Sequence, residues 1–132
     1  MALPPAGKEK GIRSGIWRGQ IGSTFHLTVD GNKVSGTFQT IHGQPDFSEV
    51  FDVTGFTDGE LIGFTVLWKG HDSVTSWSGR YCIDERGEHI RSMWHLCRKY
   101  VDKEKTQPTE EWNCVLSNIS QLYYAGELEQ GQ

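Results

Sequence analysis

The stretch GFTVLWKGHDSVTSWSG, residues 63–79, holds two tryptophans on either side of a short turn that contains glycine. If it forms a β-hairpin, its second arm places Ser73, Thr75 and Trp77 on one face, because side chains alternate along a strand. A face that combines an indole ring with two hydroxyls is not a plain apolar core face. The question is therefore whether this mixed face packs in the core or borders a space of another kind.

Turn signals continue along the chain at regular intervals and separate runs rich in Val, Ile, Thr, Phe and Trp. This pattern is typical of short antiparallel strands. The predicted strands are 12–18, 22–29, 33–40, 48–56, 61–69, 73–83, 87–98 and 112–122. Most connections are short enough to be hairpins, and an even-numbered meander can close on itself and remove its edges. The sequence therefore predicts an all-β fold, an eight-stranded antiparallel up-and-down (meander) β-barrel.

Length and composition limit the organisation and the partners. A chain of 132 residues predicts one domain, with the barrel over 12–124 and tails at 1–11 and 125–132. A net charge of -4 gives no electrostatic footprint for nucleic acid, and no apolar run approaches a membrane span. The first ten residues lack the apolar run of a signal peptide. The sequence therefore leaves two alternatives for the location of the protein: the cytosol, or secretion if a leader has been removed. Three cysteines, Cys82, Cys97 and Cys114, are predicted to be buried or half-buried.

The predicted interior mixes rings with hydroxyls. In the run 87–98, alternation places Ile90, Ser92, Trp94 and Leu96 inside and places His89, Arg91, Met93, His95 and Cys97 outside. In the run 112–122, one face carries Trp112, Cys114, Leu116, Asn118 and Ser120. A buried hydroxyl without a partner costs about 1 kcal/mol or more, whereas a binding pocket uses such groups to orient a ligand. The alternative is that the tryptophans fill the barrel ends and the hydroxyls bond to backbone or water.

Several motifs resemble those of one family. They are IWRGQIGSTFHL, VSGTFQT, IGFTVLWK, SVTSWSGRYCID, IRSMWHLCR and EEWNCVLSNIS, in this order. From about Gly15 to Tyr124 the chain is similar to the avidin and streptavidin family of biotin-binding proteins. The resemblance implies an up-and-down barrel that binds biotin at one open end, in a homo-oligomer for which a tetramer is favoured over a dimer.

The resemblance also implies roles for individual residues. The aromatic box corresponds to Trp68, Trp77, Trp94 and Trp112, of which Trp112 reaches into a neighbouring subunit's pocket. Leu96 matches an apolar wall position. The polar contacts to biotin correspond to Ser23 and Thr40 at the ureido group, Thr75 at the thioether sulfur and Ser73 at the valerate carboxylate.

Three positions depart from the family pattern. Gly19 stands where an asparagine is common, Phe38 where a tyrosine donates to the ureido oxygen, and Ser120 where an Asp or Asn accepts from a ureido nitrogen. Each lost hydrogen bond in a dry site costs roughly 1–3 kcal/mol, so weakened biotin binding is expected. Asn118, on the same face as Ser120, offers a replacement. His71 stands near the expected carboxylate position, either as a partner for an anionic tail or as a solvated loop residue.

No nucleophile with a base at suitable spacing and no phosphate-binding glycine loop occurs, so the chain is predicted to be a binding protein and not an enzyme. Neither a cofactor nor a metal is implied, because His89, His95 and Cys97 are better explained by packing at a subunit interface. Two hypotheses remain. The first is weakened biotin binding. The second is an avidin-fold oligomer that binds another cyclic ligand or a peptide, or serves a structural role.

Overall fold

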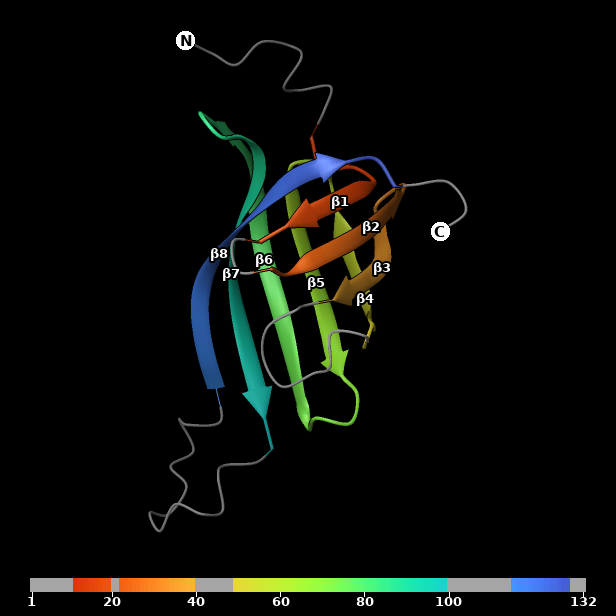
Figure 1. The fold of residues 1–132 in the computed structure, drawn as a ribbon, viewed down its shortest axis with the longest axis vertical. Helices are drawn as coiled ribbons and strands as arrows, with labels where there is room; N and C mark the ends of the chain where they lie inside the picture. The colour runs from red at the N-terminus through yellow and green to blue at the C-terminus, as the bar shows by residue number, and fades with distance from the viewer. Residues whose placement is uncertain (1–10, 20–21, 40–48, 100–114, 129–132) are drawn as a thin grey trace.

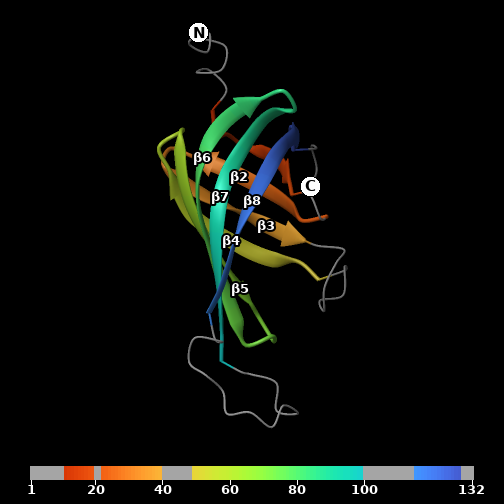
Figure 2. The ribbon, with the colours of Figure 1, turned by 90° about the vertical axis from the view of Figure 1, so that its left-hand side faces the viewer.

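The computed structural model describes residues 11–19, 22–39, 49–99 and 115–128, which form a closed antiparallel barrel. The strands are β1 (Gly15–Arg18), β2 (Thr24–Asp30), β3 (Lys33–Gln39), β4 (Phe51–Thr57), β5 (Leu61–Trp68), β6 (Ser73–Asp84), β7 (Gly87–Arg98) and β8 (Val115–Gly126). Each strand pairs with the next, and β8 returns to β1 (Figures 1 and 2). The predicted fold is therefore confirmed.

Most strands differ from their predicted bounds by a few residues, and the differences in β1 and β8 bear on how the barrel closes. The first strand begins at Gly15 rather than at residue 12, and β8 continues to Gly126 rather than ending at residue 122. The extension follows from barrel closure, because Ile16 pairs with Gly126 and Trp17 with Tyr124 across a register shift. The predicted start of the last strand, 112–114, lies outside the described residues.

Two glycines allow adjacent strands of the barrel wall to approach closely. A Cβ atom at Gly36 would lie 1.9 Å from the carbonyl oxygen of His26 on β2. A Cβ atom at Gly55 would lie 2.0 Å from the carbonyl oxygen of Gly63 on β5. No side chain fits at such distances, so these positions in β3 and β4 require glycine.

The strands are unequal in length, and this shapes the barrel. β6, β7 and β8 have 12 residues each, whereas β1 has 4 and β2, β3 and β4 have 7 each. Figure 1 shows the long strands continuing past the short ones at the end where β7 finishes and β8 begins. At that end, residues 115–119 of β8 are exposed on both faces. Leu116 and Asn118, predicted to face the interior, are therefore exposed.

Two predictions about the outer face of the barrel are wrong. His89 has an exposure of 0 %, because the ring of Tyr123 packs on it at 4.8 Å and Asp84 lies 3.9 Å from its Nδ1. Cys97 is exposed rather than half-buried, whereas Cys82 is partly buried as predicted. Cys114 lies outside the described residues.

One end of the barrel is closed by an ion pair and aromatic rings. The Arg13 guanidinium donates to both carboxylate oxygens of Glu88, at 2.7 and 3.1 Å, and lies 3.9 Å from the centroid of the Tyr124 ring. The Trp17 Nε1–H donates to the Arg13 carbonyl at 3.1 Å, and the Tyr81 hydroxyl donates to Glu88. The hydrogen bond to Glu88 raises the pKa of Arg13. Burial, followed by the Glu88 contact, raises the pKa of Tyr81 to about 12.

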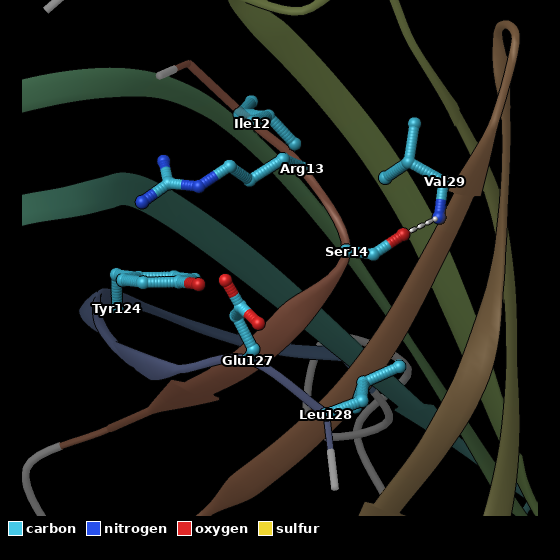
Figure 3. A pocket seen from close by; sticks show the side chains of 7 residues that line it. All are labelled: Ile12, Arg13, Ser14, Val29, Tyr124, Glu127 and Leu128. Atoms are coloured by element: carbon cyan, nitrogen blue, oxygen red, sulfur yellow. Dashed lines mark hydrogen bonds between the residues drawn. The ribbon is translucent and has the colours of Figure 1, made fainter. Parts of the chain in front are cut away.

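A groove of about 470 Å³ lies beside this closed end. Figure 3 shows the seven residues that line it, among them Arg13 beside Tyr124 and Ser14 beside Val29. Arg13 is already bound to Glu88, and the Ser14 hydroxyl accepts a hydrogen bond from the Val29 N–H at 2.8 Å. Both polar groups are therefore bonded within the barrel. Among the described residues, no helix is long and apolar enough to cross a membrane.

Candidate functional site

A cavity of about 180 Å³ occupies the end of the barrel opposite the Arg13–Glu88 ion pair. It lies where β5 ends at Trp68, beside Gly19 after β1 and Ser23 before β2. Its lining comprises aromatic, aliphatic and hydroxyl side chains and one glycine: Gly19, Ser23, Phe25, Trp68, Thr75, Trp77, Trp94, Leu96, Ser120 and Leu122. None of these residues carries a charge, so the cavity suits the neutral, partly apolar portion of a ligand.

The tryptophans are positioned by strand register and by neighbouring rings. Trp77 on β6 pairs directly with Trp94 on β7 and stacks on Phe64, with ring centroids 5.0 Å apart and planes at 16°. Trp68 packs edge-on against Phe38 at 4.9 Å and against Phe51 at 5.0 Å. These contacts hold the indoles in place before any ligand enters, which reduces the ordering cost of binding.

Thr75 is the most buried hydroxyl of the cavity, with an exposure of 2 %. Its Oγ1 lies 2.7 Å from Trp68 Nε1, which can only donate, so the threonine oxygen is the acceptor. The Thr75 proton is then directed elsewhere and can be donated to a ligand atom. The mixed face of the opening hairpin thus looks into the cavity, with Thr75 and Trp77 side by side in its wall.

The polar groups of the other wall come from two places. The Gly19 N–H donates to the Ser23 carbonyl at 2.9 Å, which fixes the chain just before β2 and leaves the Ser23 side chain in the cavity lining. On the opposite strands, Ser92 Oγ donates to the Ser120 carbonyl at 3.0 Å. The Ser92 hydroxyl is therefore used within the sheet, while the Ser120 residue lines the cavity.

The structure brings seven of the predicted site residues together around this cavity: Ser23, Trp68, Thr75, Trp77, Trp94, Leu96 and Ser120. Phe38 does not line it, because its ring is buried behind the cavity against Phe25 and Trp68. Ser73 instead lines the adjoining groove, at the end of β5 and the start of β6. Thr40 and Trp112 lie outside the described residues.

Sequence reasoning missed two lining residues, Phe25 and Leu122. Phe25 is the cross-strand partner of Phe38, and Leu122 is the partner of the interior residue Ile90. Alternation within each strand, applied to these residues, could have found them. Asn118 does not serve as the replacement suggested above, because its Oδ1 accepts a hydrogen bond from the Ile119 N–H at 2.7 Å on the exposed half of β8.

His71 lies near the cavity in the turn between β5 and β6, and it is paired. Its Nε2 lies 3.2 Å from Glu49 Oε1, and its ring packs against Phe51 at 5.9 Å. His71 is thus an exposed loop residue, as one of the two alternatives predicted, and its imidazole pairs with a carboxylate of the protein.

A closed barrel with an uncharged aromatic cavity at one end is the architecture of a small-ligand binding protein. Comparison with known proteins refines this class. The model of the Avidin family matches residues 8–118, and the chain therefore belongs to the avidin family.

Individual relatives agree with this assignment. Afifavidin of Afifella pfennigii is 39% identical over 74 residues, which are 50% of this chain and 45% of that protein. The structure of biotin binding protein from chicken is 25% identical, with a TM-score of 0.69 over 89% of this chain and 98% of that one. The rhizavidin–biotin complex shares the fold, with 23% identity and a TM-score of 0.69 over 85% of this chain and 99% of that one.

Proposed function

We propose that this protein binds biotin non-covalently in the cavity walled by Trp68, Trp77 and Trp94, and that it acts as a binding protein rather than an enzyme. The observation that carries the proposal is the combination of three indoles with the hydroxyl residues Ser23, Thr75 and Ser120 around one uncharged cavity. Biotin has a bicyclic ring with a polar ureido edge, a thioether edge and an anionic tail. Of the relatives above, the chicken protein is named a biotin binding protein, and rhizavidin is seen in a complex with biotin.

The roles are those that the family resemblance implies for the residues that line the cavity. The three indoles and Leu96 bury the bicyclic ring. Ser23 donates to the ureido oxygen, and Thr75 donates its remaining proton to the thioether sulfur, because its oxygen is occupied by the Trp68 N–H. Thr40 and Trp112 keep the roles that the family resemblance gives them, at a ureido nitrogen and at a neighbouring subunit's pocket.

We further propose that the affinity is lower than is usual in the family. Gly19 offers no side-chain donor, Phe38 has no hydroxyl and does not line the cavity, and Ser120 is shorter than an Asp or Asn. At roughly 1–3 kcal/mol for each missing hydrogen bond, three losses amount to about 3–9 kcal/mol, or about two to six powers of ten in Kd.

We also propose that the functional form is a homo-oligomer, with a tetramer favoured over a dimer. Several large apolar side chains of β5, β7 and β8 are exposed to water, and packing against further copies of the chain would bury them. They are Leu67, Met93, Val115, Leu116 and Ile119, with exposures of 41–65 %. Light scattering on a size-exclusion column should give a multiple of 14.9 kDa. A monomer at micromolar concentration would contradict this proposal.

Calorimetric titration of biotin tests the proposed function directly. We expect saturable binding at one site per chain and, for Thr75→Val, a Kd about tenfold higher, because one hydrogen bond is lost. Ser78→Ala is the matched control, since Ser78 is an exposed hydroxyl on the opposite face of the same strand. No heat of binding and no rise in Tm at high biotin concentration would refute the biotin proposal and favour an avidin-fold oligomer with another role.

A further inference from the structure

Phe51 at the start of β4 and Trp68 at the end of β5 lie beyond the backbone pairing of their two strands. That pairing ends at the pair of Val53 and Val66, so each ring stands two residues past it. Side chains join the two strand ends instead, because the rings of Phe51 and Trp68 meet edge-on with centroids 5.0 Å apart. Trp68 lines the cavity, so whatever holds Phe51 in place also helps to hold a wall of the candidate site.

The turn that follows β5 brings His71 back to Phe51. The His71 N–H donates to the Trp68 carbonyl at 2.8 Å, and Gly70 supplies the left-handed conformation of this turn at φ 88°. The imidazole packs edge-on against Phe51, with centroids 5.9 Å apart, and its Nε2 lies 3.2 and 3.4 Å from the two carboxylate oxygens of Glu49. An ionised carboxylate can only accept, so Nε2 carries the proton and donates. His71 is therefore fixed twice, by its backbone to the end of β5 and by its side chain to the segment before β4.

We propose that the Glu49–His71 pair positions the wall of the binding site without touching the ligand. The pair holds Phe51 against the Trp68 indole, and the indole N–H donates to Thr75 Oγ1 at 2.7 Å. A shift of Phe51 would therefore move this N–H and turn the Thr75 proton away from the ligand. The inference rests on the proposed function, in which Thr75 donates to the thioether sulfur of biotin. Neither residue of the pair lines the cavity, and their side chains are 33% and 39% exposed, so the effect on affinity should be moderate.

The test compares biotin with desthiobiotin, which keeps the ureido ring and the acid tail but has no sulfur. In calorimetric titrations, His71→Ala should raise the Kd for biotin about fivefold and the Kd for desthiobiotin less than about twofold, because only biotin loses the Thr75 contact. Glu49→Ala should give the same pattern, and the double variant should lose no more than His71→Ala alone, since both substitutions break one pair. His71→Gln should recover part of the affinity, because an amide N–H can still donate to Glu49.

Asp72→Asn is the matched control for the turn. Asp72 is the exposed neighbour of His71, and its ion pair with Lys99 is also exposed. Asparagine tolerates the φ of 55° at this position. The control variant should therefore keep the wild-type Kd for both ligands.

The outcomes separate the role of the Glu49–His71 pair from the proposed function. An unchanged Kd for biotin in both alanine variants would overturn the positioning role while leaving biotin binding in place. Equal losses for the two ligands would also overturn it, because they indicate a general loosening of the site, and so would additive losses in the double variant. If His71→Ala does not fold, Glu49→Ala decides with the same two ligands, because Glu49 lies outside the strands. Failure of the wild-type protein to bind either ligand would overturn the proposed function itself.

Discussion

Both ends of this barrel combine tryptophans with polar side chains, but the polar groups have different partners at the two ends. At the closed end, Arg13, Glu88 and Tyr81 bond to one another above the buried Trp17. At the other end, Trp68 and Thr75 form one hydrogen bond, while Ser23 and Ser120 border an uncharged cavity. At the closed end the polar groups thus bond to one another, whereas at the cavity end hydroxyl residues line a space that a ligand can occupy.

The difference shows why an indole in a barrel is not by itself a sign of a ligand site. Trp17 and Trp77 are both buried in the same core cluster. Trp17 is covered by Tyr124, 5.1 Å away, and donates to the Arg13 carbonyl. Trp77 has Trp94 as its cross-strand partner and faces the cavity. The partners of each ring, rather than its type, therefore separate packing from binding.

The largest expected effect comes from removing one tryptophan at each end. Trp17→Ala should lower the free energy of unfolding by about 3–5 kcal/mol, because it empties a fully buried site. Trp94→Ala should cost only about 1–2 kcal/mol, since Trp94 is half-buried and borders an existing cavity, yet it should weaken biotin binding strongly. Urea denaturation and calorimetric titration measure the two effects. Equal losses of stability would contradict the distinction between the ends.

A second prediction concerns the ion pair of the closed end. Glu88→Gln should lower the free energy of unfolding by about 1–3 kcal/mol, a value reduced from that of a fully buried pair because both side chains keep some exposure. Biotin affinity should not change, since Glu88 lies far from the cavity lining. Glu60→Gln is the control, because the Glu60–Arg80 pair is 63–67% exposed and should contribute less than about 1 kcal/mol. A similar loss in both variants would argue against a special role for the closed end.

The sequence predicted the fold well because its signals are local. Turn residues and alternation mark strands wherever one face is buried, and short connections leave few topologies. The family resemblance located most of the cavity lining, including Trp77 and Thr75. It could not reveal that Phe38 packs behind the cavity or that His89 is covered, because both depend on which neighbouring rings fill the space. Asn118 was misjudged because alternation gives a face but not where the barrel wall ends.

A third prediction concerns the pH dependence of the closed end. The pKa of Tyr81 is raised to about 12, first by burial and then by the hydrogen bond to Glu88. Because this folded-state value lies above the ordinary tyrosine value of about 10, the neutral phenol stabilises the fold fully below pH 10, and that contribution declines as the pH rises toward 12. Absorbance at 295 nm follows the ionisation. Tyr81→Phe should remove the component that titrates last, and identical titrations of the two proteins would contradict the assignment.

The smallest expected effect concerns the cavity, and it is the only expected gain in biotin affinity. A Cβ atom at Gly19 would lie 3.4 Å from both the Leu122 side chain and the Ser23 Cβ, so there is room for a side chain that faces the cavity. Gly19→Asn should restore one donor to the ureido oxygen and tighten biotin binding about tenfold, equivalent to about 1.4 kcal/mol. Gly31→Asn is the control, because Gly31 lies in an exposed turn at φ 62° with no atom within 4 Å of its Cβ position, and asparagine tolerates this conformation. If Gly19→Asn folds with unchanged stability but binds biotin no better than Gly31→Asn, the missing donor does not limit affinity. The weakness would then be traced to Ser120, the other departure that lines the cavity.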